Sequence, residues 1–236
     1  VSPGGVLAVT FTNKAAKEMV ARLTAMLPLN VRGMWIGTFH GLCNRFLRAH
    51  YKLANLPASF QILDTQDQLS AIKRLCKQFN VDEERYPPKQ LQWFIAGCKE
   101  DGLRARDVVQ GQGHAPDQAL QKKIEIYQLY EDQCQREGVV DFGELMLRSY
   151  ELLRDNDPVR EHYQRRFKHI LIDEFQDTNK LQYDWLRLLA GSDNAVFAVG
   201  DDDQSIYAFR GARVGKLLRL LQRERHAGAC RIERLS

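Results

Sequence analysis

The chain has 236 residues, of which 44% are hydrophobic and 27% charged, and this composition is typical of a soluble globular protein with one large or two small domains. Its net charge of +4 is compatible with a nucleic-acid partner but does not require one. The five cysteines are scattered and never spaced as C-x-x-C, which argues against a disulfide framework or zinc site and favours a cytoplasmic location. No stretch approaches the roughly 18 apolar residues that span a bilayer, so we expect no membrane partner.

Both ends of the chain are predicted to cut through structure. The first residue is Val1 rather than Met, and a strand is predicted within a few residues of it. Residues 230–235 predict another strand that is only beginning. We therefore expect the chain to be a fragment of a longer protein.

The first 64 residues predict alternating strands and helices. Residues 6–11 are apolar and β-branched, as in a buried strand, and Thr12 or Asn13 can cap the helix that follows. That helix is predicted to bury a face made of Ala16, Met19, Val20, Leu23 and Leu27. A short strand at 34–36 precedes a second helix, which is predicted to bury Leu42, Phe46 and Leu47 and to expose Arg45 and Arg48.

From about residue 66 to residue 165 the sequence predicts helices and no strong strand. Asp64 is predicted to cap a helix, further helices are predicted to start at Asp117, Asp141 and Asp157, and Pro88 suits the first position of another. The predicted apolar faces include Ile72, Leu75, Phe79, Leu91 and Ile95. We interpret residues 65–166 as an all-helical insertion subdomain.

The last part of the chain returns to an α/β pattern. Strands are predicted at 170–172, at 195–199 and near Cys230, and helices at 179–189 and 214–221. The predicted fold class is α/β, with a parallel sheet built from residues 1–64 and 167–236 and interrupted by the helical insertion.

Two adjacent acids, Asp173 and Glu174, follow the strand at 170–172. Ligands of open α/β sheets bind outside the carboxyl ends of the strands, so these acids are placed where a ligand binds. An acid at this position can hold Mg²⁺ on nucleotide phosphates, and a second acid can activate water. The pattern alone also fits a solvated acidic turn.

Glutamines accompany the acids at two predicted strand ends. Gln176 follows the acid pair, and Gln204 follows the acidic turn 201–203 after the next strand. Such an amide can sense a terminal phosphate without adding charge, although from the residues alone a simple loop amide is the better explanation of Gln204.

Aromatic residues with basic or hydroxyl neighbours occur just past three strand ends. The three clusters are Phe11 with Thr12, Asn13 and Lys14; Phe39 with Thr38 and His40; and Tyr207 and Phe209 with Arg210. Single-stranded nucleic acids are bound by aromatic platforms together with phosphate donors. Each aromatic taken alone also fits a place in the core.

A phosphate-binding loop of the form G-x-x-x-x-G-K-[ST] is absent from the 236 residues. Gly215 and Lys216 form the one Gly-Lys pair, but Leu217 follows them and Arg210 stands where the first glycine belongs. The chain therefore carries a predicted magnesium and water site without its phosphate cradle.

Four segments resemble motifs of the UvrD/Rep-type DNA helicases of superfamily one, and the resemblance extends over essentially the whole chain. Residues 8–16, AVTFTNKAA, are similar to motif Ia, and residues 37–41, GTFHG, to motif Ib. Residues 173–179, DEFQDTN, are similar to motif II, and residues 199–207, VGDDDQSIY, with 210–212, RGA, to motif III. The motif II and motif III segments are the most specific.

The resemblance implies an ATP-dependent helicase that moves 3′ to 5′ on single-stranded DNA in repair and replication. The sheet would be the first RecA-like domain, of the P-loop NTPase type, and the insertion would touch duplex DNA at single-strand/duplex junctions. Asp173 would bind Mg²⁺, Glu174 would activate water, and Gln204 would contact the γ-phosphate of ATP. The residues implied to contact DNA are Phe11, Thr12, Asn13, Thr38, His40, Tyr207, Phe209 and Arg210.

The sequence departs from the family pattern in three ways. Phe209 stands where these helicases usually have tryptophan. The phosphate-binding strand and loop are expected before Val1, and the second RecA-like domain, with its arginine fingers, after Ser236. The chain alone is therefore expected to be inactive or nearly so.

Two other functions fit part of the pattern. A module that binds single-stranded DNA or a protein partner without nucleotide would explain the missing phosphate-binding loop. A helicase–nuclease of the RecB or AddA kind would need a nuclease domain far downstream, and the compact helical insertion argues against it.

Overall fold

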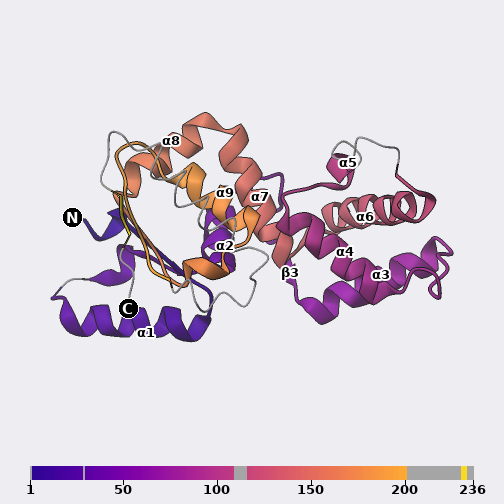
Figure 1. Cartoon of the computed structure of the whole chain (residues 1–236), viewed down its shortest axis with the longest axis horizontal. Coiled ribbons are helices and arrows are strands. Elements are labelled where there is room, and N and C mark those ends of the chain that lie inside the picture. Colours follow the sequence, from indigo (N-terminus) through magenta and orange to yellow (C-terminus); the bar gives the residue numbers. More distant parts are fainter. Residues whose placement is uncertain (1, 29, 109–115, 201–229, 233–236) are drawn as a thin grey trace. The chain divides into compact units, whose positions relative to one another are not determined.

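The architecture was obtained as a computed structural model, which describes residues 2–28, 30–108, 116–200 and 230–232 (Figure 1). The predicted helix at 214–221 lies outside these residues. So do the acidic turn 201–203 and four predicted site residues, Gln204, Tyr207, Phe209 and Arg210.

A five-stranded parallel sheet has the order β2-β1-β5-β6-β7. Its strands are β1 (Val6–Thr10), β2 (Trp35–Thr38), β5 (His169–Ile172), β6 (Ala195–Ala198) and β7 (Cys230–Ile232). Each neighbouring pair is parallel, and β5 lies beside β1 although more than 150 residues separate them in the chain. The predicted parallel α/β fold class is therefore confirmed.

The register of the sheet places the carboxyl ends of four strands at one edge. Thr10 is the partner of Thr38, Val9 is the partner of Ile172, and Ile172 is the partner of Ala198. The loops that leave β1, β2, β5 and β6 therefore begin next to one another, which is the edge where open parallel sheets bind ligands.

Helices cover both faces of this sheet (Figure 1). One side carries α1 (Asn13–Met26), and the other carries α8 (Asp157–Arg166) and α9 (Lys180–Leu189). The start of α2 (Phe39–Ala49) packs against α9, with the rings of Phe39 and Trp185 6.0 Å apart. Three short 3-10 helices complete the chain here: η1 (Pro3–Gly5), η2 (Val31–Gly33) and η3 (Phe175–Asp177).

Several predicted helix features are confirmed and two are wrong. Leu42, Phe46 and Leu47 are buried in α2, as expected from their spacing. In α1, however, no residue is buried and Val20 is 36% exposed, because this helix packs mainly at the edge of the sheet, on the edge strand β2 and on its neighbour β1. Phe79 is 42% exposed because it is the C-cap of its helix, where the helical stripe ends.

A second compact unit comprises residues 46–149, while residues 1–45 and 150–236 form the first. Its elements are β3 (Gln61–Leu63), α3 (Thr65–Gln78), α4 (Pro88–Glu100), α5 (Ala105–Val108), α6 (Gln118–Glu137), β4 (Val139–Asp141) and most of α7 (Phe142–Asp155). Asp64 and Asp117 cap their helices and Pro88 opens α4, as predicted. The predicted boundaries at 64 and 166 remain a prediction.

Strand β4 lies inside the stretch for which no strand is predicted. It pairs with β3 in parallel, with Ile62 opposite Val140, and forms a separate two-stranded sheet. Three residues are too short to show a period of two in the sequence, which is why β4 was missed. Asp141 ends this strand and caps α7, since its Oδ1 accepts a hydrogen bond from the Glu144 N–H at 2.7 Å.

Replacement of Gly138 by alanine is expected to destabilise the second unit by about 1–3 kcal/mol. Gly138 ends α6 in the left-handed region with φ of 66°, and an added Cβ would come within 2.8 Å of the Pro57 ring. Denaturant unfolding of the variant checks this value. Gly97→Ala is the matched control, because a Cβ there meets no atom within 4 Å, and it should not lower the stability.

Among the described segments, no helix combines the length and apolarity needed to cross a membrane.

Candidate active site

Asp173 follows β5 at the carboxyl edge of the sheet. Its backbone N–H donates to the Val9 carbonyl at 3.0 Å, so the residue still continues the ladder with β1. The Asp173 side chain is half-buried, and its Oδ2 accepts a hydrogen bond of 3.4 Å from the Thr10 hydroxyl. Thr10 itself is only 1% exposed, and therefore a fixed neighbour orients this carboxylate.

Glu174 is exposed and has a left-handed backbone, with φ of 51° and ψ of 47°. Such a conformation costs a residue with a Cβ about 1–3 kcal/mol, and strain of this kind is concentrated at functional sites. The Glu174 carboxylate accepts a hydrogen bond of 2.5 Å from the Gln176 side-chain amide. The two acids therefore have different surroundings, one half-buried beside a hydroxyl and one exposed beside an amide.

The turn after β5 is tied to the end of β6. The Phe175 N–H donates to the Val199 carbonyl at 3.0 Å, and the Val199 N–H donates to the Ile172 carbonyl at 2.8 Å. Gln176 is buried against this junction, with 5% of its surface exposed. The ends of β5 and β6 therefore lie side by side, while the polar groups predicted at the end of β6, the turn 201–203 and Gln204, lie outside the described residues.

The donor set at Asp173 fits Mg²⁺. Magnesium prefers oxygen ligands and is usually held by one or two carboxylates, with water and substrate phosphates completing its shell. Asp173 supplies one carboxylate next to the Thr10 hydroxyl. Within the described ranges no three His, Cys, Asp or Glu side chains are arranged so that they could together hold a metal ion.

The first turns of α1 and α2 begin at the same edge of the sheet. Thr12 caps α1 by accepting from the Ala15 N–H, and Thr38 accepts from the Gly41 N–H, both at 3.1 Å. Asn13 and His40, which follow these residues, are exposed. Since helix N-termini attract anions, this edge offers donors for phosphates beside the acid pair.

Phe11 and Phe39 have different environments. Phe39 is 2% exposed and packs on Trp185, so it belongs to the core. Phe11 is half-buried and touches Phe39, with ring centroids 5.2 Å apart. Phe11 therefore packs against the buried ring of Phe39 and keeps part of its own ring accessible to solvent.

Sequence reasoning missed Thr10, the neighbour of Asp173. In the sequence, Thr10 stands out only as a hydroxyl residue in an otherwise apolar strand. This becomes informative once the strand register places Thr10 beside Asp173. Of the predicted residues, Asp173, Glu174, Thr12, Asn13, Thr38, His40 and Phe11 lie at or next to the carboxyl edge. Gln204, Tyr207, Phe209 and Arg210 lie outside the described residues.

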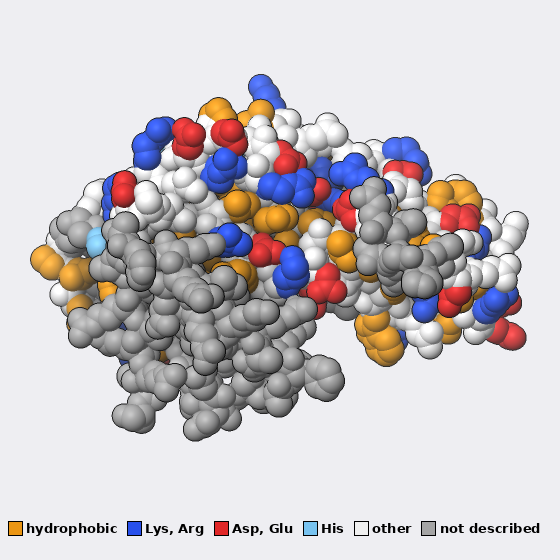
Figure 2. Space-filling view, turned by 45° about the horizontal axis from the view of Figure 1, so that its top comes forward, with side chains coloured by type: hydrophobic (Ala, Val, Ile, Leu, Met, Phe, Trp, Pro, Cys, Tyr) orange, Lys and Arg blue, Asp and Glu red, His pale blue; other side chains and the backbone are white. Residues whose placement is uncertain are grey.

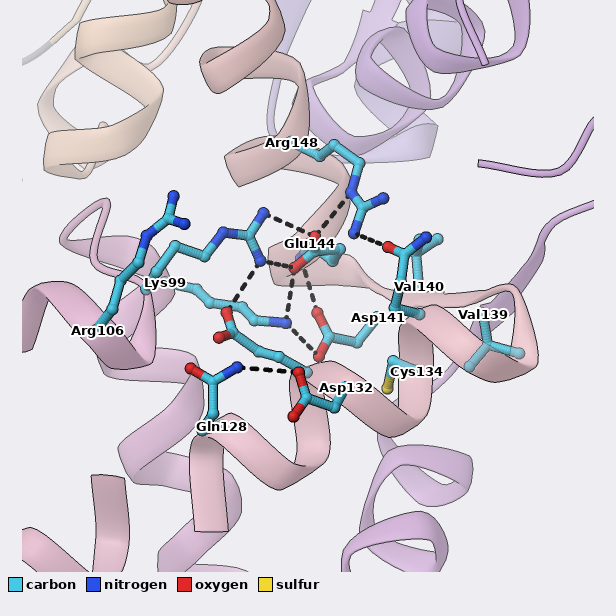
Figure 3. Close-up of a pocket in the computed structure, with 13 residues that line it drawn as sticks. Lys99, Arg106, Gln128, Asp132, Cys134, Val139, Val140, Asp141, Glu144 and Arg148 are labelled. Carbon is cyan, nitrogen blue, oxygen red and sulfur yellow. Dashed lines mark hydrogen bonds and ion pairs between the residues drawn. The ribbon is translucent and has the colours of Figure 1, made fainter. Parts of the chain in front are cut away.

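The second unit contains a charged pocket of about 200 Å³, shown in Figure 3. Its centre is a buried network in which the Lys99 ammonium lies 2.9 Å from Asp141 and 3.0 Å from Glu144. Arg104 and Arg148 bind Glu144 at 2.8 and 2.9 Å. None of the predicted site residues lines this pocket, and the charges at its centre are paired with one another, so we assign this network a structural role.

Basic and acidic side chains alternate on the face shown in Figure 2. No extended patch of one sign is visible there among the described residues.

Comparison with known proteins gives consistent matches. Residues 1–224 match the model of the UvrD/REP helicase N-terminal domain. DNA helicase II of Escherichia coli is 50% identical over 98% of this chain, and DNA helicase II of Haemophilus influenzae is 49% identical over 94%. The ATP-dependent DNA helicase PcrA of Leuconostoc citreum is 38% identical over 92%. The chain spans about a third of the length of these relatives, 32% for the first of them.

Proposed function

Because the chain belongs to the UvrD/REP helicase family, we propose that it forms the first RecA-like domain of an ATP-dependent helicase that moves 3′ to 5′ along single-stranded DNA. The observation that carries the proposal is the pair Asp173 and Glu174 at the carboxyl end of β5, with Thr10 and Gln176 bonded to the two carboxylates.

In this proposal Asp173 holds Mg²⁺, with the Thr10 hydroxyl fixing its carboxylate. When bound there, the metal would neutralise charge on the phosphates of ATP. Glu174 orients a water and takes its proton as the water oxygen bonds to the γ-phosphorus. The bond from that phosphorus to the β–γ bridging oxygen breaks, and ADP and phosphate are the products. Gln204 is proposed to contact the γ-phosphate.

Single-stranded DNA is proposed to pass over the starts of α1 and α2. Phe11 offers a supported ring for stacking, while Thr12, Asn13, Thr38 and His40 offer donors for the strand. Tyr207, Phe209 and Arg210 are proposed to complete the path. We further propose that the protein acts at junctions of single-stranded and duplex DNA, together with repair proteins, in the cytoplasm. The four cysteines in the described ranges are free thiols, which is consistent with a reducing compartment.

Phe11→Ala is expected to weaken binding of a single-stranded oligonucleotide roughly 5- to 150-fold, because one stacked base contributes about 1–3 kcal/mol. Fluorescence anisotropy measures the dissociation constant, and circular dichroism checks that the fold is kept. Phe79→Ala is the matched control, since Phe79 is also a partly exposed phenylalanine but lies at the end of α3. Equal affinities of wild type and Phe11→Ala would remove Phe11 from the DNA path.

The 236 residues contain no phosphate-binding loop, which supports the further proposal that the isolated chain has little or no ATPase activity. An arginine finger alone is worth 10³–10⁵ in rate in other NTPases. The same absence favours a second candidate, a module that binds single-stranded DNA or a protein partner without nucleotide. ATP hydrolysis stimulated by DNA in the full-length protein separates the two, because the second candidate predicts none.

A further inference from the structure

We propose that Gln176 is a positioning residue that holds the Glu174 carboxylate for the attacking water and connects it to the end of β6. The inference rests on the proposed function, since it assigns a role toward the water that Glu174 is proposed to activate. It concerns a residue of the turn that touches neither nucleotide nor metal in the proposed mechanism.

The contact between the two side chains is short and directional. The Gln176 Nε2 amide donates to Glu174 Oε2 at 2.5 Å, and Gln176 is 5% exposed. Glu174, in contrast, is exposed on a strained backbone, so packing does not select one side-chain rotamer for it. The buried amide is therefore the group that fixes the carboxylate.

The oxygen of the Gln176 amide does not contribute to the stability of the fold. This atom, Oε1, is buried and has no hydrogen-bond partner among the described residues. A buried acceptor without a partner costs free energy, whereas an apolar side chain of the same length, such as methionine, would occupy this space without that cost. A glutamine here therefore weakens the fold locally, and its benefit has to come from the bond to Glu174.

The end of β6 is built around the same amide. A Cβ added to Gly200 would collide with Gln176 Oε1 and lie 3.2 Å from the Phe175 nitrogen. A larger residue at this position would therefore require the amide to shift. Gly200 therefore lies close to the Gln176 amide, and this amide, through its bond to Glu174, connects the water-activating carboxylate to the end of β6.

The test is Gln176→Met in the full-length protein, with DNA-stimulated ATP hydrolysis and thermal unfolding measured on the same preparation. We expect kcat to fall about 10- to 100-fold, the range seen when groups that orient catalytic ligands are removed. The KM for ATP should not change, because Glu174 acts in the chemical step. The unfolding temperature should be equal to or higher than that of the wild type, because the unpartnered oxygen is gone.

Gln182→Met is the matched control. Gln182 is a buried glutamine of the same unit, 8% exposed, whose side chain completes the cap of α9 by accepting from the Asn179 N–H at 3.0 Å. This variant should lower the unfolding temperature and leave kcat unchanged.

Wild-type kcat in Gln176→Met would overturn the inference. So would a loss of kcat that comes with a lowered unfolding temperature, because Gln176 would then be structural. If the wild-type protein itself shows no DNA-stimulated ATP hydrolysis, the proposed function fails and the inference fails with it. This outcome is distinguishable from a failure of the inference alone, because it is seen in the wild type before any substitution is made.

Discussion

Replacement of Glu174 by glutamine is expected to reduce DNA-stimulated ATP hydrolysis by the full-length protein 10²- to 10⁴-fold. Glutamine has nearly the size of glutamate but cannot take a proton from water. The side chain is exposed, so the substitution removes no core packing. The Asp173 carboxylate and its bond to Thr10 are untouched, and binding of ATP with Mg²⁺ should therefore persist. Steady-state phosphate release over a range of ATP concentrations measures the effect.

Glu161→Gln is the control for that experiment. Glu161 is an exposed glutamate of α8 in the same unit, and its ion pair with Arg165 is long at 3.9 Å. It should hydrolyse ATP at the wild-type rate. A Glu174→Gln variant with wild-type turnover would contradict the assignment of Glu174 as the group that activates water.

Replacement of Lys99 by methionine is expected to destabilise the second unit by about 3–5 kcal/mol. The ammonium is buried with Asp141 and Glu144, with 3–5% of each of the three side chains exposed. Methionine fills much of the same volume but leaves the two carboxylates without the charge between them (Figure 3). Losing one member of a buried ion pair costs more than the pair contributes, because the remaining charge stays desolvated.

A surface ion pair gives the matched control. Lys122 lies 3.0 Å from Glu125 on α6, a separation like that in the buried network, but these side chains are 35% and 57% exposed. Lys122→Met should change the free energy of unfolding by less than about 1 kcal/mol, because solvent screens the pair. Chemical denaturation compares the variants, and equal losses at Lys99 and Lys122 would show that the network does not stabilise the unit.

The same network predicts loss of stability in acid. Burial alone would raise the pKa of Glu144, but Lys99, Arg104 and Arg148 hold that pKa well below its usual range. A carboxyl group whose pKa is lower in the folded state contributes its full stability above the unfolded-state pKa. The contribution from Glu144 is lost as the pH falls through the lowered folded-state pKa.

The loss of stability at high pH comes from the Lys99 ammonium. Burial alone would lower the pKa of Lys99, but Asp141 and Glu144 raise that pKa above its usual value. Its contribution is complete below the unfolded-state pKa and is lost only as the pH rises through the raised pKa, in strong alkali. Between these limits the network should give a flat stability profile.

The sheet could be predicted from the sequence because its strands are short apolar runs that end in polar turns. Helix starts could also be predicted, since Thr12, Asp64 and Asp117 are capping residues that can be recognised from the local sequence. Asp173 and Glu174 were found for the same reason, as two acids at the end of an apolar run.

What could not be predicted depends on contacts distant in sequence. Thr10 and Asp173 are 163 residues apart, so their hydrogen bond follows only from the pairing of β1 with β5. Strand β4 has three residues and is defined by pairing with β3, 78 positions away. Lys99 reads in the sequence as a solvated lysine of α4, and only the fold shows that it is buried between two carboxylates.

In the proposed function, the turn after β5 activates water in a DNA-dependent ATPase. The most direct test is Mg²⁺-dependent ATP hydrolysis, with and without single-stranded DNA, by the full-length protein and by the isolated 236-residue chain. We predict DNA-stimulated turnover by the full-length protein, and no turnover but retained single-strand binding by the isolated chain. Turnover by the isolated chain that Glu174→Gln abolishes would contradict the claim that the site needs a phosphate-binding loop, and absence of turnover in the full-length protein would contradict the ATPase itself.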